Sequence, residues 1–374
     1  MHLISRKKIA NKHSSVVIKV GTRLMTDTAV IGTIVSQIAT LKKNGKNVIL
    51  VSSGAVGLGI KTLGLNSRPS RLSEIQALAS IGQSKLMSLY EKECAKHGFH
   101  AAQLLLTASD IMDRERHLNV MNCINSLWKW NILPVINEND SVSVDELKFG
   151  DNDCLSALIA VMMKSELTII LTTIDGLHTI ENGKLSSRIS IVKEISSEIK
   201  NMATNTDDKT LSIGGMASKI HAAEIVTSAG SYLWIANGKN TDTLDKIFKG
   251  EDIGTIFLPS DNSHMRTKKR WLSFFSRPAG ELRVDSGAEK AIIGKGGSLL
   301  PSGIKSVTGQ FKRGDTVLIC SLDGKQIAKG LSNYSSEEMS AIAGAKSANI
   351  AKIIGYQNED EAVHRDNLAL IKNN

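Results

Sequence analysis

Residues 132–140 read ILPVINEND, and residues 149–153, after a short polar loop, read FGDND. The apolar run from Ile132 to Ile136 predicts a buried strand, so the amides and acids that follow lie at its carboxyl end. Open α/β sheets bind their ligands at this edge. The stretch therefore indicates a parallel sheet with a binding site at its carboxyl edge.

Apolar strand-like and helix-like segments alternate around this stretch. The expected strands are residues 16–20, 48–51, 101–106, 132–136, 167–171 and 231–236. The expected helices are residues 31–41, 71–97, 155–163 and 215–229. This alternation predicts an α/β fold, a mostly parallel sheet with helices on both faces. Residues 175–212 contain Asp175-Gly176, Asn182-Gly183 and a stretch rich in Ser, Thr, Asn and Asp, and are interpreted as turns and a mobile loop.

The pattern changes from residue 280 onwards. Short β-like runs separated by glycine-rich turns are found at residues 282–284, 291–293, 316–320 and 326–328. They predict a small β-barrel, with some helix near residues 337–345. The chain therefore divides into a domain at residues 14–262, a basic linker at 263–279 and a second domain at 280–374.

The composition is that of a globular protein, with 41% apolar and 22% charged residues in a chain of 374. The formal charge of +9 lies mostly before residue 280, because residues 280–374 hold twelve Lys and Arg against eleven Asp and Glu. Four cysteines without a Cys-x-x-Cys pair indicate reduced thiols and no zinc site, and no metal ligand is assigned. No run reaches the roughly 18 apolar residues of a membrane span. We expect a soluble, cytoplasmic protein with no membrane partner.

Two lysines are candidates for an anion site. Lys19 lies inside an apolar strand that is followed by Gly21, and a buried ammonium without a partner there is costly. Lys219 follows Gly214-Gly215 by one turn, at the start of an apolar helical stretch. Amides freed by glycine, a helix N-terminus and two lysines favour phosphate binding.

Three acids allow several interpretations. Asp140, Asp151 and Asp153 could bind a metal, hold the lysines, bind a substrate amine or cap the helix that begins near Asn152. Phosphoryl transfer suits the whole set, because it depends on cations and amides that position spread negative charge. No serine, histidine or cysteine stands out as a nucleophile, which fits a carboxylate acceptor that is already ionised.

Several motifs resemble the amino acid kinase family, in particular its members that phosphorylate L-glutamate. The matching segments are VIKVGT (17–22), SSGA (52–55), DRER (113–116), PVINEND (134–140), GDND (150–153) and GGMASK (214–219). Residues 299–309, LLPSGIKSVTG, and RGD at 313–315 resemble the PUA domain that bacterial members append. The resemblance implies a three-layer α/β/α kinase domain at 14–262 and a PUA domain at 280–374.

The resemblance also implies an activity. It is ATP-dependent phosphorylation of the side-chain carboxylate of L-glutamate to L-glutamyl 5-phosphate, the first step of proline biosynthesis from glutamate. Mg²⁺ would accompany ATP, L-proline would be a feedback inhibitor, and the chain would form a homo-oligomer.

Residue roles follow from the same resemblance. Lys19 and Lys219 would bind the ATP phosphates and stabilise the transferring group, and Asp151 and Asp153 would orient the lysines and the substrate amine. The glutamate-binding set would be Ser53, Gly54, Asp140, Asn152 and Asp153. The nucleotide pocket would be lined by Thr172, Thr173, Ile213, Gly214, Gly215, Met216, Ala217, Ser218 and Lys219.

Two positions depart from the family pattern, which usually has Asp in place of Thr173 and often Thr in place of Ile213. Both changes remove a polar partner on the nucleotide side. Two other functions are alternatives. A different amino acid kinase would act on another carboxylate or on a carbamate. RNA binding by the PUA domain is not favoured, because that segment is nearly neutral and aromatic residues make up only 4% of the chain.

Overall fold

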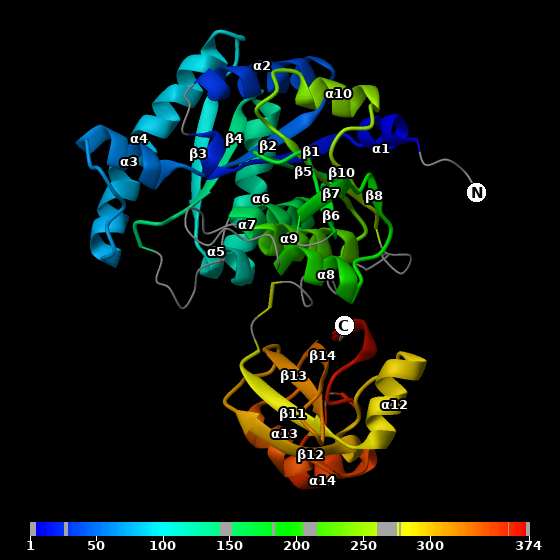
Figure 1. The fold of residues 1–374 in the computed structure, drawn as a ribbon. Helices are drawn as coiled ribbons and strands as arrows, with labels where there is room; N and C mark the ends of the chain where they lie inside the picture. The colour runs from blue at the N-terminus through cyan, green and yellow to red at the C-terminus, as the bar shows by residue number, and fades with distance from the viewer. Residues whose placement is uncertain are drawn as a thin grey trace. The chain divides into compact units, whose positions relative to one another are not determined.

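The structure is a computed structural model that separates into two compact units, residues 1–264 and 265–374. It describes residues 5–25, 29–142, 152–181, 184–204, 215–259, 275–276, 278–357 and 359–371. Each unit has its own sheet and its own hydrophobic core (Figure 1). The domain limits and the basic linker stay a prediction, because most of residues 263–279 lie outside the described residues.

An eight-stranded sheet forms the centre of the first unit, in the order β3-β4-β2-β1-β5-β9-β10-β8. Its strands are β1 (Ser15–Val20), β2 (Asn47–Ser52), β3 (Ala101–Leu106), β4 (Leu133–Glu138), β5 (Leu167–Thr172), β8 (Ile191–Val192), β9 (Tyr232–Asn237) and β10 (Thr255–Phe257). All pairs from β3 to β9 are parallel, whereas β10 runs antiparallel to β9. The predicted mostly parallel sheet is confirmed.

Helices cover both faces of this sheet (Figure 1). They are α1 (Arg6–Lys12), α2 (Ala29–Lys43), α3 (Ala55–Leu63), α4 (Leu72–Ala95), α5 (Ala108–Met112), α6 (Arg114–Lys129), α7 (Asn152–Met163), α8 (Ser197–Thr204), α9 (Met216–Ser228) and α10 (Thr243–Lys249). Helices α2 and α10 lie over one face, and α6, α7 and α9 lie over the other. The predicted three-layer arrangement is therefore present.

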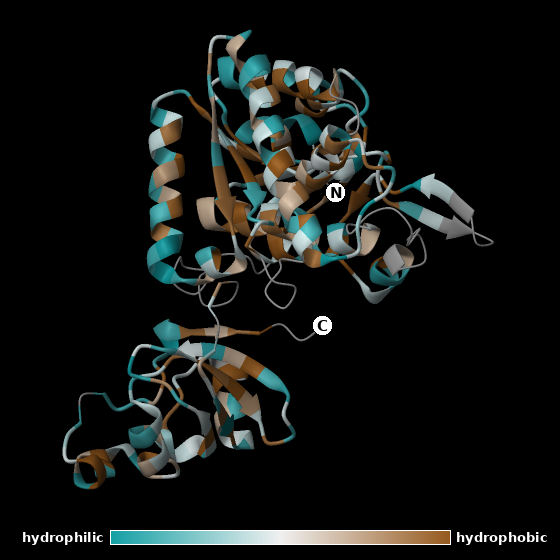
Figure 2. Cartoon of the chain, turned by 90° about the vertical axis from the view of Figure 1, so that its left-hand side faces the viewer, coloured by the Kyte–Doolittle hydropathy of each residue, from teal (hydrophilic) through white to brown (hydrophobic). Residues whose placement is uncertain are grey.

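The alternation of side chains along β1 explains how the layers form. Val16, Ile18 and Val20 point to one face and join the core that contains the apolar stripe of α2. Lys19 therefore points to the opposite face, where α7 packs against β1. Figure 2 shows the strands of the large sheet mostly brown, whereas the helices carry teal and brown bands, as expected for amphipathic helices on a buried sheet.

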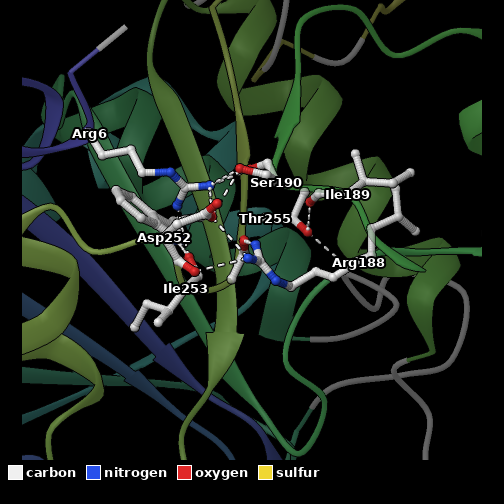
Figure 3. Close-up of polar contacts among 10 residues, drawn as sticks. Arg6, Arg188, Ile189, Ser190, Asp252, Ile253 and Thr255 are labelled. Carbon is white, nitrogen blue, oxygen red and sulfur yellow. Dashed lines mark hydrogen bonds and ion pairs between the residues drawn. The ribbon is translucent and has the colours of Figure 1, made fainter. Parts of the chain in front are cut away.

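Helix α1 is tied to the edge strands by a buried arginine (Figure 3). Arg6 is 8% exposed, and its guanidinium donates to the carbonyl oxygens of Ile253 at 2.9 Å and Ser190 at 2.7 Å. Its Nη2 also lies 2.8 Å from Oδ1 of Asp252, a carboxylate shared with Arg188. The guanidinium carbon lies 5.1 Å from the ring centre of Trp234. The residues before β1 are thus part of the fold.

The second unit is built on a five-stranded sheet in the order β12-β11-β13-β14-β15. Its elements are β11 (Gly280–Val284), α12 (Ser286–Lys295), β12 (Ile304–Gly309), β13 (Thr316–Ser321), β14 (Gln326–Leu331), α13 (Ser336–Ile342), α14 (Ile350–Ile354) and β15 (Leu368–Leu370). Strand β11 pairs in parallel with β13, and the remaining pairs are antiparallel. The core of this unit includes Leu282, Ile319 and Tyr334.

Two segments differ from the expectation. Residues 175–212 contain the hairpin of β6 (His178–Glu181) and β7 (Lys184–Arg188), strand β8 and helix α8, so the interpretation as turns and a mobile loop was wrong for the described part. Residues 291–293, expected as a strand, belong to α12. Asp285 caps that helix by accepting a hydrogen bond from the backbone N–H of Ala288 at 2.9 Å.

Candidate active site

Parallel strands bring polar side chains to one edge of the large sheet. Strand β1 pairs with β2 and β5, and β2 pairs with β4, so their carboxyl ends are neighbours. Lys19 is the penultimate residue of β1, Ser52 ends β2 and Thr172 ends β5. Strand β4 continues through Asn137 and Glu138, so these two residues are buried in the strand and not in the loop after it.

A buried carboxylate joins the two lysines. Asp153, in the first turn of α7, is 0% exposed, and Lys19 and Lys219 are each 5% exposed. The Nζ atom of Lys19 lies 2.6 Å from Oδ1 of Asp153, and that of Lys219 lies 3.0 Å from Oδ2. Burial alone would raise the pKa of Asp153, but the two ammonium groups outweigh it and lower that pKa from 3.8 to about 2. The cluster carries one net positive charge, which suits an anionic ligand.

The N-terminus of α9 lies beside this cluster. Gly215 caps the helix. The hydroxyl of Ser218 lies 3.0 Å from the Gly215 carbonyl oxygen and 3.1 Å from Oδ2 of Asp153, and its one hydrogen is shared between them. The ammonium of Lys219 also lies 3.3 Å from the Gly215 carbonyl oxygen. A helix start beside two buried ammonium groups can hold phosphate oxygens. Met216 is buried in this first turn, followed by Ala217, whereas Ile213 and Gly214 lie outside the described residues.

Asn152 connects α7 to β2 and β4. Its Nδ2 lies 3.1 Å from the carbonyl oxygen of Ser52, 2.8 Å from Oγ of Ser53 and 2.8 Å from Oδ1 of Asn137. Its two amide hydrogens are thus shared among three acceptors. These contacts fix the start of α7, and with it the position of Asp153, against the sheet edge.

Gly54, the N-cap of α3, has a backbone conformation that favours glycine. Its φ is +107°, and a Cβ atom there would lie 2.8 Å from Cβ of Met25. The turn therefore brings the backbone after Ser53 close to the site without a side chain.

Thr172 and Thr173, expected to line the nucleotide pocket, lie at the end of β5. The carbonyl oxygen of Thr172 accepts from the backbone N–H of Gly238 at 2.8 Å, and Thr172 and Thr173 are both partly exposed. This places them on the α9 side of Lys19, since β5 lies between β1 and β9. The consequence of Thr173 for nucleotide binding stays a prediction.

Asp140 lies on the other side of the site, in the wall of a cavity of about 30 Å³. The cavity is lined by Ala55, Ala79, Ser80, Gln83, Leu105, Glu138, Asn139, Asp140 and Ser141. The predicted set therefore divides into a lysine and α9 side and a β4 side, with Asn152 and Ser53 between them. Asp151 lies outside the described residues.

Within the described residues no group of three or more His, Cys, Asp or Glu side chains could hold a metal ion. Both carboxylate oxygens of Asp153 already face lysines. Mg²⁺ prefers octahedral oxygen ligands and is often bound through substrate phosphates. The site as described thus fits a metal that arrives with the nucleotide better than one held in a cage of carboxylates.

Comparison with known proteins identifies the family. The model of the amino acid kinase family matches residues 14–237, more than half of the chain. The chain belongs to the amino acid kinase family. The PUA domain model matches residues 280–354 of this kinase.

Curated relatives of this amino acid kinase match over nearly the whole chain. The glutamate 5-kinase of Desulfotalea psychrophila is 44% identical over 98% of this chain and 99% of that protein. The glutamate 5-kinase of Caldanaerobacter subterraneus subsp. tengcongensis is also 44% identical, over 96% and 98%. Among solved structures, a Giardia carbamate kinase covers 66% of this chain and 99% of its own, with 18% identity and a TM-score of 0.47.

Two buried residues beside the candidate site were not identified from the sequence. Gln83 on α4 accepts from Nδ2 of Asn137 at 2.9 Å, and Tyr90 on the same helix places its hydroxyl 2.8 Å from Oγ of Ser52. Neither stands in a glycine-rich or acidic motif, so the sequence carried no signal for them.

Among the described residues, no helix is long and apolar enough to span a membrane.

Proposed function

We propose that this amino acid kinase transfers the γ-phosphoryl group of ATP to the side-chain carboxylate of L-glutamate. A carboxylate oxygen forms a bond to the γ-phosphorus, the bond from that phosphorus to the bridging oxygen breaks, and ADP leaves. The product is L-glutamyl 5-phosphate, so the reaction is the first step of proline biosynthesis from glutamate. The full-length similarity to glutamate 5-kinases supports this substrate.

The buried trio of Lys19, Asp153 and Lys219 is the observation that carries the proposal. Phosphoryl transfer needs positive charge around the equatorial oxygens, held in place before the reaction. Asp153 fixes both ammonium groups and is itself held by its place in α7. We assign the lysines to the transferring phosphoryl group and Asp153 to their positioning.

The acceptor side needs binding groups more than a general base. A glutamate side chain, with a pKa of about 4.3, is ionised at neutral pH and attacks without losing a proton. Ser53, Gly54, Asn152 and Asp140 are assigned to bind it, at the ends of β2 and β4 and the start of α7. Asp140 would pair with the substrate ammonium.

The nucleotide is assigned to the opposite side, between the N-terminus of α9 and the end of β5. Its pocket would include Thr172, Thr173 and the residues from Ile213 to Lys219, with Asp151 near the phosphates. Mg²⁺ would enter with ATP and would supply charge neutralisation on the β- and γ-phosphates.

The test is ATP-dependent formation of acyl phosphate, trapped with hydroxylamine, by the purified protein with Mg²⁺ and L-glutamate. Lys219→Met removes the charge but keeps the length of the side chain. We expect it to lower the rate at least about 100-fold, as for loss of one electrostatic group in such a site. Lys246→Met is the matched control, because Lys246 is a partly exposed helix lysine in α10 and should leave the rate unchanged.

The outcomes separate the reaction from the site. A folded wild-type protein that forms no hydroxamate with L-glutamate would overturn the proposed reaction. Full activity in Lys219→Met would overturn the site assignment instead. A panel with L-aspartate, N-acetyl-L-glutamate and carbamate distinguishes this reaction from those of other amino acid kinases.

Four further expectations stay predictions. They are feedback inhibition by L-proline, assembly into a homo-oligomer, a cytoplasmic location, and the absence of a strong RNA-binding role for the PUA domain. Adding L-proline to the hydroxamate assay and measuring the molar mass in solution would test the first two.

A further inference from the structure

A chain of buried amides runs from α7 to α4 through β4. Oδ1 of Asn137 accepts a hydrogen bond from the backbone N–H of Glu138 at 2.9 Å. A backbone N–H can only donate, so this contact identifies the oxygen of the Asn137 amide. Nδ2 of Asn137 must then be the donor in its 2.9 Å contact with Gln83, whose Oε1 accepts. The orientation of the Gln83 amide is thereby fixed.

This orientation leaves the amide nitrogen of Gln83 without a partner. Gln83 is only 7% exposed, and its Nε2 is buried without a hydrogen-bond partner in the described part of the chain. An unpaired buried donor destabilises a protein by about 1–3 kcal/mol, and native proteins pair nearly all such groups. The missing partner is therefore expected to come from a ligand.

Asn152, at the other end of this row of amides, has a buried acceptor without a partner. Its Nδ2 donates to the carbonyl oxygen of Ser52, which can only accept, so the other terminal atom is Oδ1. That oxygen is also buried and unpaired in the described residues. One donor and one acceptor, linked through Asn137, match a ligand that carries both a carboxylate and an ammonium group.

Gln83 is held rigidly in the wall of the cavity at the end of β4. The preceding residue, Gly82, packs against α3 so closely that a Cβ atom would lie 1.7 Å from the carbonyl oxygen of Ala55. Two acids, Glu138 and Asp140, line the same cavity, so a bound carboxylate needs both a donor there and an ammonium group on the same molecule. An α-amino acid meets both requirements.

The distance to the lysines indicates which end of the substrate reaches Gln83. Strand β2 lies between β4 and β1, so the end of β4 is about 9–10 Å from Lys19. In the proposed reaction the side-chain carboxylate of L-glutamate lies at the lysines. Its α-carboxylate then extends toward β4.

We propose that Nε2 of Gln83 donates a hydrogen bond to the α-carboxylate of bound L-glutamate and selects for that group. The inference rests on the proposed function and adds a specificity residue to the acceptor site. Gln83 acts on binding of the substrate and not on the transferring phosphoryl group.

Gln83→Glu tests this donor directly. The new side chain keeps an oxygen to accept from Asn137 but places an anionic oxygen where Nε2 was. We expect L-glutamate to bind at least about 10-fold more weakly, with ATP binding within about twofold of wild type. The α-amide of L-glutamate can donate to the new carboxylate, so the ratio of kcat/KM for L-glutamate to that for the α-amide should fall at least about 100-fold.

The matched control is Ser80→Asp. Ser80 lines the same cavity one turn earlier on α4, and its hydroxyl donates to the carbonyl oxygen of Gln76. This variant adds a charge to the cavity but keeps Nε2 of Gln83. We expect the ratio of kcat/KM for L-glutamate to that for the α-amide to change less than about fivefold. An equal change in both variants would show a general charge effect and would overturn the assignment.

Binding of L-glutamate, measured by calorimetry with a non-hydrolysable ATP analogue, gives a readout independent of turnover. If folded Gln83→Glu keeps the wild-type ratio of kcat/KM for L-glutamate to that for the α-amide, the role of Gln83 is overturned. If the wild-type protein is inactive with L-glutamate, the proposed function is overturned instead. If Gln83→Glu does not fold, Gln83→Met removes the same donor without adding charge. Wild-type affinity for L-glutamate in that variant would refute the inference, and a loss of at least about 10-fold would support it.

Discussion

Replacing Asp153 by asparagine should destabilise the first unit strongly, because it removes the shared counterion of two buried lysines. The carboxylate is fully buried, and its oxygens lie 2.6 Å from Nζ of Lys19 and 3.0 Å from Nζ of Lys219. Removing one partner of a buried ion pair destabilises a protein by about 3–5 kcal/mol. The loss should be near the upper end, because Asp153→Asn leaves two uncompensated ammonium groups.

The assay is urea unfolding followed by tryptophan fluorescence. Trp234 is fully buried in the core of the first unit, and Trp128 and Trp130 lie in the same unit. Three of the four tryptophans therefore report on the kinase domain, and the fourth, Trp271, lies outside the described residues. With a slope of about 2–3 kcal/mol per M, the midpoint should fall by about 1–2 M. Asp242→Asn is the control. Its ion pair with Lys246 is partly exposed, and loss of this pair should change the unfolding free energy by less than about 1 kcal/mol.

The pH dependence gives a second test of the same group. The pKa of Asp153 is about 2 in the folded protein against 3.8 ordinarily, so its ionisation stabilises the fold by about 2 kcal/mol above pH 5. A lowered folded pKa means that this stabilisation is lost as pH falls toward 2, and about half is lost by pH 3. The stability gap between wild type and Asp153→Asn should therefore narrow by about 1 kcal/mol between pH 7 and pH 3. A urea midpoint of Asp153→Asn equal to that of wild type at pH 7 would refute this reasoning. A stability difference between the two proteins that does not decrease from pH 7 to pH 3 would also refute it.

Three further predictions test packing and hydrogen bonding within the first unit. Gly82→Ala forces a Cβ atom into the α3 backbone and should destabilise the first unit by at least about 3 kcal/mol, whereas Gly57→Ala, with open space on α3, should be neutral or stabilising. Arg6→Met removes the guanidinium from two carbonyl oxygens and a carboxylate, each of which keeps another donor. It should lower the unfolding free energy by about 2–4 kcal/mol, measured by the same urea assay. Tyr90→Phe removes the buried hydroxyl that lies 2.8 Å from Oγ of Ser52 and 3.7 Å from Sδ of Met25. It should lower the unfolding free energy by about 1 kcal/mol, and a loss above 3 kcal/mol would contradict the loss of these two contacts alone.

The sheet and its functional edge could be predicted from the sequence because their signals are local. Apolar runs followed by glycine marked the strand ends near Lys19 and Ser53, and Gly215 marked the start of α9. Local signals could not show which of Asp140, Asp151 and Asp153 pairs with the two lysines. Asp153 is the buried partner of both lysines because α7 begins at Asn152 and turns that side chain toward β1, which depends on tertiary contacts.

Other features could not be predicted because their cause is not local. Gln83 in an amphipathic helix would usually be exposed, and its burial follows from the contact of Gly82 with α3. The apolar triplet at residues 291–293 fits a strand or a helix equally well on periodicity alone. The cap at Asp285 was the local signal that could have favoured the helix.

The network of Arg6 determines where this chain can be shortened. A fragment trimmed to residues 14–237, the range matched by the family model, would keep Lys19, Asp153 and Lys219 but would lack Arg6 and strand β10. Trp234 would then become exposed, because its indole N–H donates to the carbonyl oxygen of Ile253 and its ring packs against the guanidinium of Arg6. An expression fragment designed on motif limits alone would thus hold the reacting groups on a sheet with an uncovered edge, and is expected to aggregate. A minimal catalytic fragment should begin before Arg6 and extend past Phe257.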